Sequence, residues 1–350
     1  MSAPNSTLPL LNVVAIGAGY FSRFHFSAWQ RLSQTSLSAI VEQDSARRTS
    51  LKAEFRHVQV AATLAEVVQE MSPDIVDIIT PPHTHSEQID SAIRLTERAL
   101  VVCQKPFCGD SHTATRVAEK VAAAGRTLVV HENFRFQPWY RQIKQLLQRK
   151  AVGTVLQAEF RLRPGDGQGV NAYLDRQPYF QTMPRFLIHE TGIHWIDVFR
   201  YLFGEPQAVS ADLRTINPAI KGEDAGHFSF HYTDGLRACF NGNRHLDHAA
   251  DNPRLTMGEM LIEGTRGTIN LNGDGEIHLR KFGQKHLQPH RYSFDNIDFG
   301  GDCVFQLNKH IAEHLTEGKL LQNDAMAYLE NLRLEDLVYR AAGENSLQQV

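Results

Sequence analysis

The chain has 350 residues, of which 42% are hydrophobic and 21% charged, and its formal net charge is -3. This length exceeds what one hydrophobic core usually supports, so we expect two domains. The small negative charge, with Arg and Lys scattered along the chain, argues against a nucleic-acid partner. No apolar run approaches the length of a membrane span, which argues against a membrane protein.

The N-terminus and the cysteines bear on the compartment. The first residues carry no Lys or Arg and lead straight into an apolar run, so they lack the parts of a secretory signal, and we interpret 1–10 as a flexible tail. The cysteines form no C-x-x-C pair and are expected to be buried thiols: Cys103, Cys108, Cys239 and Cys303. A reducing compartment follows, and we expect a cytoplasmic protein.

From Leu11 to His131, short apolar runs alternate with stretches that place apolar residues at helical spacing. This is the βαβ rhythm of a parallel sheet. The expected strands lie at 11–17, 37–41, 57–63, 74–80, 99–104 and 126–131. Six such strands make a complete doubly wound sheet, so the sequence predicts an N-terminal α/β Rossmann domain over 11–137.

After Pro138 the rhythm changes. A helix at 139–149 leads into a strand at 153–163 and a long helical stretch at 184–203, and alternating runs with T-D-G, T-R-G and G-D-G turns follow. We expect an α+β domain over 138–350 with an open, largely antiparallel sheet. Helical stretches at 184–203, 304–316 and 325–342 are available to cover its faces, and the last of them to pack back on the Rossmann domain.

The first strand ends in G-A-G-Y-F-S, which places Gly17 and Gly19 in the turn before the first helix. Backbone at such a turn passes close to a pyrophosphate, and the helix amides and dipole face the anion. We therefore assign Tyr20, Phe21 and Ser22 to the cofactor site as well, with Ser22 where the fingerprint prefers Gly or Ala. The alternative is a tight turn that holds no ligand.

Two acidic residues follow the second strand. Glu42 is placed to accept hydrogen bonds from the adenosine ribose, and Asp44 either does the same or caps the second helix. Two carboxylates would repel a 2′-phosphate, so NAD is favoured over NADP although Arg47 and Arg48 lie one turn later.

Five motifs point to one family. They are the G-A-G-Y-F-S turn, T-P-P-H-T-H after the fourth strand, Q-K-P after the fifth, N-F-R after the sixth, and E-T-G-I-H in the second domain. Together they resemble the Gfo/Idh/MocA oxidoreductases, from the first strand to the last helix. The resemblance implies an NAD(P)-dependent enzyme acting on CH-OH groups, assembled as a homodimer or homotetramer.

The family pattern at the fifth strand is E-K-P, and here it reads Gln104, Lys105, Pro106. The resemblance implies that Lys105 hydrogen-bonds the reacting oxygen and that Gln104 and Lys105 border the cofactor. It also implies an unusual peptide geometry at Pro106 that aims the lysine. Taken alone, one lysine beyond a strand is more often a solvated surface charge. The amide at Gln104 leaves the lysine without an adjacent carboxylate.

The second-domain pattern is an Asp four residues before a His, and here Glu190 precedes His194. This spacing places both on one helix face, where the carboxylate can orient the imidazole or stabilise its protonated form. We therefore take His194 as the candidate general base and Glu190 as its partner. The alternative is a surface ion pair on a helix.

Further site residues follow from the resemblance. It implies that Thr80, Pro81 and His85 contact the cofactor, although His85 alone would more often cap or pack a helix. It also implies that Asn133 and Arg135 border nicotinamide and substrate. The stretch H-E-N-F-R-x-Q-P-W looks like the group that oxidises small aldoses, branched pentoses such as apiose among them.

A sugar or polyol substrate also suits the polar segment 171–185. Side chains such as Tyr179 and Arg185 could bind several hydroxyls, or the segment could be an exposed loop.

Two other interpretations compete. His310, Glu313 and His314 spell H-x-x-E-H, as in some zinc peptidases, but a further ligand is lacking downstream, so we expect an exposed helix face and no metal. The second is an NAD-binding sensor or regulator without turnover, which Gln104 and Glu190 favour and which the retained Lys105 and His194 oppose.

Overall fold

A computed structural model describes residues 10–350, so the predicted tail at 1–10 lies outside the described residues apart from Leu10. The chain divides into two compact units. Unit 1 comprises the residues up to Glu132 together with Val304–Glu330, and unit 2 comprises Asn133–Cys303 and Asn331–Val350. The division thus lies slightly before the predicted boundary at 137/138, and 304–330 groups with unit 1.

Unit 1 is built on a parallel sheet of six strands in the order β3-β2-β1-β4-β5-β6. This is the strand order of a dinucleotide-binding fold, in which ligands bind at the carboxyl ends of the strands where the order reverses. The predicted Rossmann domain is confirmed. Its strands are β1 (Leu11–Ile16), β2 (Thr35–Val41), β3 (Gln59–Ala61), β4 (Ile75–Ile78), β5 (Leu100–Gln104) and β6 (Leu128–His131).

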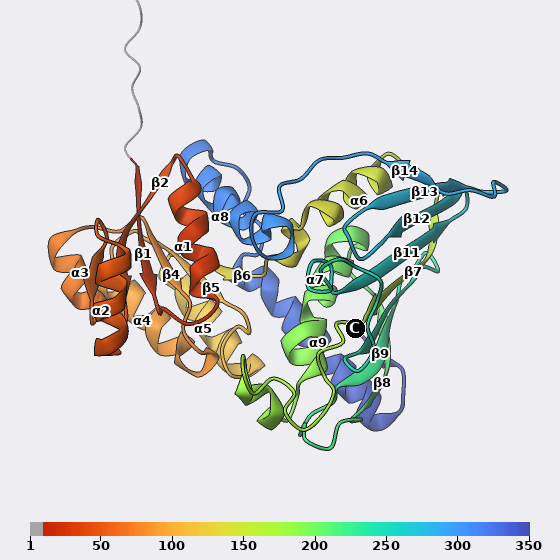
Figure 1. The fold of residues 1–350 in the computed structure, drawn as a ribbon, viewed down its shortest axis with the longest axis horizontal. Coiled ribbons are helices and arrows are strands. Elements are labelled where there is room, and N and C mark those ends of the chain that lie inside the picture. The colour runs from red at the N-terminus through yellow and green to blue at the C-terminus, as the bar shows by residue number, and fades with distance from the viewer. Residues whose placement is uncertain (1–9) are drawn as a thin grey trace, which may run out of the picture. The chain divides into compact units, whose positions relative to one another are not determined.

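Helices connect these strands and cover the sheet (Figure 1). Helices α3, α4 and α5 contact one another in that order. Side-chain caps start three of the helices: Asp44 for α2, Thr63 for α3 and Asp110 for α5. The helical elements are α1 (Ser22–Arg31), α2 (Ser45–Glu54), α3 (Leu64–Glu70), η1 (Pro82–Thr84), α4 (His85–Leu95) and α5 (Ser111–Ala123).

A late segment completes unit 1. Helix α8 (Phe299–Glu317) contains a break at 300–302, where the backbone is left-handed, and from Val304 on it belongs to unit 1. The chain then meets the edge strand β6, where the Val130 amide donates to the Asn323 carbonyl at 2.9 Å. The stretch 304–316 was expected to be available to cover the second sheet, and in the structure it groups with unit 1. Among the described residues, no helix is long and apolar enough to cross a membrane.

Unit 2 carries a nine-stranded sheet in the order β14-β13-β12-β11-β7-β10-β9-β8-β15. The largely antiparallel sheet is confirmed, but it is mixed, because β7 and β10 pair in parallel. Its strands are β7 (Val155–Leu162), β8 (Ala208–Arg214), β9 (Ala225–His231), β10 (Arg237–Asn243), β11 (Gly258–Gly264), β12 (Gly267–Leu271), β13 (Ile277–Lys281), β14 (Gln288–His290) and β15 (Gln348–Gln349).

Aromatic side chains join this sheet to helix α7 (Ile193–Phe203). Trp195 stacks on Phe160 of β7 with ring centroids 4.1 Å apart, and Phe199 packs edge to face on Phe228 and Phe230 of β9. Each buried aromatic contributes about 1.5–3 kcal/mol, so this layer fixes α7 on the sheet. The other helical elements are η2 (Phe134–Phe136), α6 (Pro138–Gln148), η3 (Pro178–Thr182), η4 (Leu187–Gly192) and α9 (Ala325–Glu344), which joins unit 2 at Asn331.

Candidate active site

The turn after β1 requires glycine at its first position. Gly17 has a φ of +98°, and a Cβ there would lie 2.9 Å from Thr80 Cγ2 and 3.1 Å from the carbonyl carbon of Ile79. At Gly19, by contrast, a Cβ would meet no heavy atom within 4 Å. The turn is therefore pressed against the loop after β4 on one side and open on the other, as close approach of a phosphate requires.

Helix α1 starts directly from this turn. Ser22 is its first residue, and its hydroxyl donates to the Gly19 carbonyl at 2.7 Å. Phe21 occupies the capping position and supplies no side-chain hydrogen bond to the helix. Because no side chain caps the first turn, the helix end keeps the partial positive charge that attracts anions.

A hollow of about 480 Å³ adjoins the turn. It lies between α1 and α2, and its lining includes Gly19, Tyr20 and Ser22 from the turn and Arg47 from α2. The predicted cofactor residues Tyr20 and Ser22 thus line an open cavity of unit 1.

Glu42 lies beside the same turn. Its Oε2 accepts a hydrogen bond from the Ala18 amide at 3.1 Å, and its Oε1 accepts one from the Asp44 amide at 2.9 Å. Asp44 caps α2, with its Oδ1 accepting from the Arg47 amide at 2.7 Å. Of the two roles predicted for Asp44, the capping hydrogen bond is the one present in the structure. Arg48 is occupied as well, since it donates to the carbonyls of Glu42 and Gln43.

The loop after β4 is braced by His85. Its Nε2 lies 2.8 Å from the Thr80 carbonyl oxygen, and the Thr84 hydroxyl donates to the Thr80 hydroxyl at 2.7 Å. Burial lowers the pKa of His85 to about 4, against the opposing effect of the carbonyls of Thr80 and Pro106. The neutral ring has a single N–H, and its Nε2 donates it to the Thr80 carbonyl, so His85 braces the Thr80–Pro81 loop.

At the end of β5, the predicted motif is held by a network that sequence analysis did not single out. The Lys105 amide donates to Gln104 Oε1 at 2.7 Å, and the Lys105–Pro106 peptide bond is cis. Gln104 contacts the buried His25, which in turn contacts the buried Asp77 and His131. One signal was available in the sequence: Asp77 interrupts the apolar run of a central strand, where a carboxylate is rare unless it is paired.

In unit 2, Asn133 and Arg135 lie at the η2 turn. Asn133 is buried at its start. Arg135 makes a two-pronged ion pair with the buried Asp197 of α7, at 2.7 and 2.5 Å, and Asn331 also donates to Asp197 at 2.8 Å. The guanidinium of Arg135 thus fixes η2 to α7.

The segment that carries Glu190 and His194 is not the continuous α-helix expected over 184–203. It is π-helical over Leu187–Gly192 and becomes α-helical at Ile193. Such π segments are uncommon and are frequent at functional sites. His194 is buried and stacks on Phe134, with ring centroids 3.7 Å apart and an interplanar angle of 4°. Its ring plane is therefore fixed by packing.

Buried polar side chains hold the π segment from several directions. Glu223 Oε1 accepts from the amides of Phe186 and Ile188, and the Tyr339 hydroxyl donates to the same oxygen at 2.5 Å. His189 Nδ1 lies 2.7 Å from Glu335 Oε1.

Arg244 reaches the π segment from the end of β10. Its Nη1 donates to the Thr191 hydroxyl at 2.7 Å, while Nε and Nη2 donate to the two carboxylate oxygens of Asp166. Burial raises the pKa of Asp166, but its ion pair with Arg244 more than offsets this, and the net pKa lies below the usual value. An ion pair between the buried Arg244 and the partly exposed Asp166 therefore connects the loop after β7 to the predicted catalytic segment.

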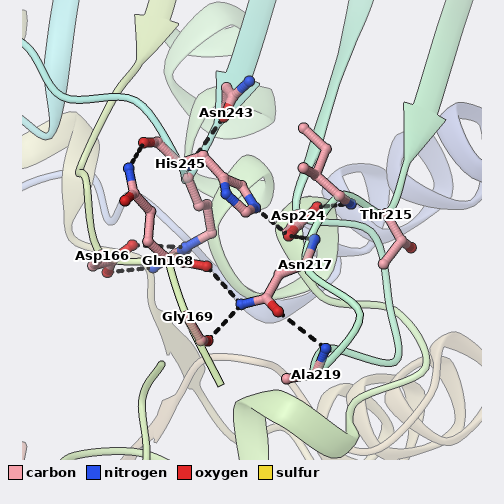
Figure 2. Close-up of polar contacts among 12 residues, drawn as sticks. Asp166, Gln168, Gly169, Thr215, Asn217, Ala219, Asp224, Asn243 and His245 are labelled. Carbon is pink, nitrogen blue, oxygen red and sulfur yellow. Dashed lines mark hydrogen bonds and ion pairs between the residues drawn. The ribbon is translucent and has the colours of Figure 1, made fainter. Parts of the chain in front are cut away.

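Neighbouring loops are tied to the same place. Figure 2 shows the side-chain amide of Asn217 donating to backbone carbonyls of the Asp166 loop, Gly169 among them. The backbone amide of Asn217 donates to the Asp224 carboxylate. His245 Nε2 lies 2.8 Å from Asp224 Oδ2. These contacts fix the loop at 167–169, which directly precedes the polar segment 171–185.

The two predicted hydroxyl-binding side chains of that segment differ. Tyr179 is 53% exposed, and its hydroxyl accepts from Gln177 at 3.2 Å. Arg185 is held by Asp336 of α9 at 2.7 Å and lies over the Tyr339 ring.

The H-x-x-E-H motif has no metal-site geometry. His314 Nδ1 lies 2.7 Å from the Lys319 carbonyl oxygen, and His310 Nε2 accepts from the Gln322 amide at 3.0 Å. Glu313 pairs with Lys319. Within residues 10–350, no group of three His, Cys, Asp or Glu side chains is arranged to hold a metal ion.

Comparison with known proteins places the chain in a family. Residues 11–132 match the model of an oxidoreductase family with an NAD-binding Rossmann fold, and residues 140–270 match the GFO/IDH/MocA C-terminal domain. A D-apiose dehydrogenase of Paraburkholderia graminis is 29% identical over 98% of this chain and 91% of its own length. Another, of Rhizobium rhizogenes, is 25% identical over 93% of this chain and 94% of its own length.

A solved structure agrees in fold. An oxidoreductase from Agrobacterium radiobacter, in complex with NAD+, L-tartaric acid and magnesium, superimposes with a TM-score of 0.84 at 24% identity, over 97% of this chain and 98% of that chain. Both domains of the chain and nearly its whole length are accounted for by these matches. The chain therefore belongs to the Gfo/Idh/MocA family of NAD-binding oxidoreductases.

Proposed function

We propose that the protein is an NAD-dependent dehydrogenase that oxidises a hydroxyl carbon of a sugar or polyol. The observation that carries the proposal is the Gly17 turn, open at Gly19 and bordered by the Glu42 carboxylate. This arrangement fits the pyrophosphate and ribose of a dinucleotide. Bound NAD supplies the nicotinamide ring that takes up the hydride.

Charge at the end of β2 favours NAD over NADP. A 2′-phosphate would approach the carboxylates of Glu42 and Asp44, while Arg48 is already bound to two carbonyls. We expect calorimetry to give at least about tenfold tighter binding of NAD than of NADP. Equal affinity would contradict this preference.

The remaining cofactor contacts that we propose lie on the loops at the same edge of the unit 1 sheet and at the start of unit 2. The loops after β1, β4 and β5 follow the carboxyl ends of parallel strands, and such loops form the ligand-binding edge of a doubly wound sheet. The residues are Tyr20, Phe21, Ser22, Thr80, Pro81, His85, Gln104 and Asn133.

The chemistry that we propose uses three side chains. Lys105 donates a hydrogen bond to the hydroxyl oxygen being oxidised and stabilises the negative charge that develops there. His194 accepts the hydroxyl proton, and Glu190 stabilises the protonated imidazole. The stacking of His194 on Phe134 supports this role, because a general base must keep its orientation.

The substrate that we propose is a small aldose, such as a branched pentose, oxidised to the lactone. The two D-apiose dehydrogenases among the relatives support this class. Tyr179 and Arg185 are proposed to bind substrate hydroxyls. Because Arg135 is engaged with Asp197, we propose that it acts by fixing η2.

The test is NADH absorbance with a panel of aldoses and polyols that includes D-apiose. We expect turnover of at least one member, and for Lys105→Ala a fall in kcat of at least about a hundredfold with unchanged NAD affinity. Lys120→Ala, which removes an exposed ion pair with Asp90, is the control and should change neither value. Normal turnover by Lys105→Ala would overturn the role of the lysine.

One outcome of this test would change the proposed function, and the proposed assembly is tested separately. NAD binding without turnover of any panel member would favour the alternative function, a sensor or regulator. We also propose a homodimer or homotetramer, as the family resemblance implies, and light scattering of the purified protein measures this directly.

A further inference from the structure

Unit 1 buries a chain of polar side chains beneath the end of β5. His25 of α1 and Asp77 of β4 are fully buried, and Gln104 at the end of β5 is 8% exposed. Polar groups are costly to bury unless they are hydrogen-bonded. The three residues come from separate elements and meet in one place, so their pairing is a feature of the fold.

The chain of contacts is continuous. Asp77 Oδ2 lies 2.7 Å from His25 Nδ1, and it also accepts from Trp29 Nε1 at 2.7 Å. His25 Nε2 lies 2.9 Å from Gln104 Nε2. Gln104 Oε1 in turn accepts from the Lys105 amide at 2.7 Å. A buried carboxylate is thus connected through two side chains to the backbone of Lys105.

Hydrogen-bonding capacity fixes the direction of each contact. The Lys105 amide can only donate, so the Gln104 atom facing it must be the carbonyl oxygen. The amide nitrogen of Gln104 then faces His25, and since it can only donate, His25 Nε2 must accept. An accepting Nε2 carries no proton, so the imidazole is neutral and its single proton lies on Nδ1, toward Asp77.

The other arrangement is less well satisfied. A doubly protonated His25 would pair with the Asp77 anion, but its Nε2 proton would need the Gln104 carbonyl. Rotating the Gln104 side-chain amide to supply that carbonyl would turn its NH₂ group toward the backbone N–H of Lys105. The buried Lys105 N–H would then lack an acceptor.

His131 adds no charge to this cluster. Its ring centroid lies 4.2 Å from that of His25. Burial, together with the nearby His25, lowers the pKa of His131 to about 3, against the opposing effects of Asp77 and Asn308.

We propose that Asp77, His25 and Gln104 form a relay that positions Lys105, in which Gln104 holds His25 as the neutral tautomer protonated on Nδ1. The three are positioning residues, and their effect on turnover rests on the proposed function. The relay also gives a reason for an amide at position 104. A carboxylate there would present an acceptor to His25 Nε2 and would call for a second proton on the ring.

The protonation state is tested by 15N NMR of histidine-labelled protein at pH 7, with the His25 signals assigned by their loss in His25→Gln. We expect a neutral ring protonated on Nδ1 in the wild type and a doubly protonated ring in Gln104→Glu. A doubly protonated or Nε2-protonated His25 in the wild type would overturn the relay. So would a Gln104→Glu spectrum identical to that of the wild type.

The positioning role is tested by Gln104→Met, which removes both hydrogen bonds at similar volume. We expect exchange of the Lys105 amide proton to rise at least about tenfold and kcat to fall about tenfold. Gln104→Glu keeps the acceptor for the Lys105 amide and should restore slow exchange.

The control is Trp29→Phe, which removes the other donor to Asp77 and leaves Gln104 in place. It should leave both the His25 tautomer and the Lys105 exchange rate unchanged. Equal increases in exchange in Trp29→Phe and Gln104→Met would assign the effect to core packing and overturn the relay. If no sugar is turned over by the wild type, the proposed function fails, while the NMR and exchange results still decide the relay.

Discussion

The turn after β1 and the π-helical segment of unit 2 are built in opposite ways. At the turn, the backbone itself sets the geometry, because Gly17 is left-handed and packed against Ile79 and Thr80. The segment over Leu187–Gly192 instead depends on side chains from distant parts of unit 2, since Glu223, Glu335 and Arg244 each hold one of its residues.

The difference determines how each region responds to change. A backbone turn has a small number of positions that accept few residue types, so one added methyl group at such a position can disrupt it. A segment braced by several side chains loses one contact at a time, and each loss is partial. We therefore expect a sharp effect at the turn and graded effects in unit 2.

Gly17→Ala is expected to have the largest effect. The new Cβ would lie 2.9 Å from Thr80 Cγ2 and 3.1 Å from the Ile79 carbonyl carbon, at a φ of +98°. The turn must shift, and we expect NAD affinity to fall about a hundredfold or more, about 2.7 kcal/mol, by calorimetry. The control is Gly125→Ala, where φ is +64° and a Cβ meets nothing within 4 Å. It should lower stability slightly and leave NAD affinity unchanged; equal losses of affinity would remove the special role of the turn.

The brace at His85 should appear as a pH dependence of stability. Burial lowers the pKa of His85 from 6.5 to about 4. Between these two pKa values the unfolded chain binds a proton at His85 that the folded protein does not bind. The folded state therefore loses stability relative to the unfolded state as the pH falls from 6.5 toward 4. We expect about 2 kcal/mol of the unfolding free energy to be lost between pH 7 and pH 5 from this residue.

Denaturant titrations of the wild type and His85→Gln at both pH values measure this contribution. The difference in stability between the two proteins should shrink by that amount at pH 5. The exposed neighbour His83, changed to Gln, should show no such pH dependence relative to the wild type. A difference independent of pH would show that His85 is not held neutral.

The Gly17 turn and unit 2 also show what the sequence could predict. The six strands of unit 1 and the Gly17 turn follow from apolar periodicity and from glycine spacing, which are local properties of the chain. For the same reason the hairpins of unit 2 were predicted from their turns. The parallel pairing of β7 with β10 was not, because strand order depends on contacts between residues far apart in sequence.

Long-range contacts also explain the rest of what was missed. His25 lies 52 positions from Asp77 and 79 from Gln104, so nothing local links the three. Likewise, Arg244 meets Thr191 across 53 positions. The spacing of Glu190 and His194 gave no sign of the π-helical winding, which has no simple pattern in sequence. Chain order predicts that 304–330 belongs to the second domain, whereas long-range contacts group this segment with unit 1.

Thr191→Val tests the graded response of unit 2. It removes the acceptor of the buried Arg244 Nη1 at nearly constant volume. We expect a loss of about 1.5 kcal/mol in the free energy of unfolding and, because the same segment carries Glu190, a fall in kcat of about fivefold with unchanged NAD affinity. Thr316→Val on α8 is the matched control, since its hydroxyl bonds only a helix carbonyl, at 2.9 Å. An effect on kcat in both variants would show that the π segment has no special connection to turnover.

The smallest effect is expected at Asp44, where two roles were open. Its carboxylate accepts from the Arg47 amide at 2.7 Å and so caps α2, and Asp110 caps α5 through the Thr113 amide at the same distance. Asp44→Ala and Asp110→Ala should therefore each lower the free energy of unfolding by about 1 kcal/mol. If capping is the whole role of Asp44, both variants bind NAD as tightly as the wild type. A selective loss of NAD affinity in Asp44→Ala would instead make Asp44 a ribose contact beside Glu42, and would extend the sharp response of the turn to the start of α2.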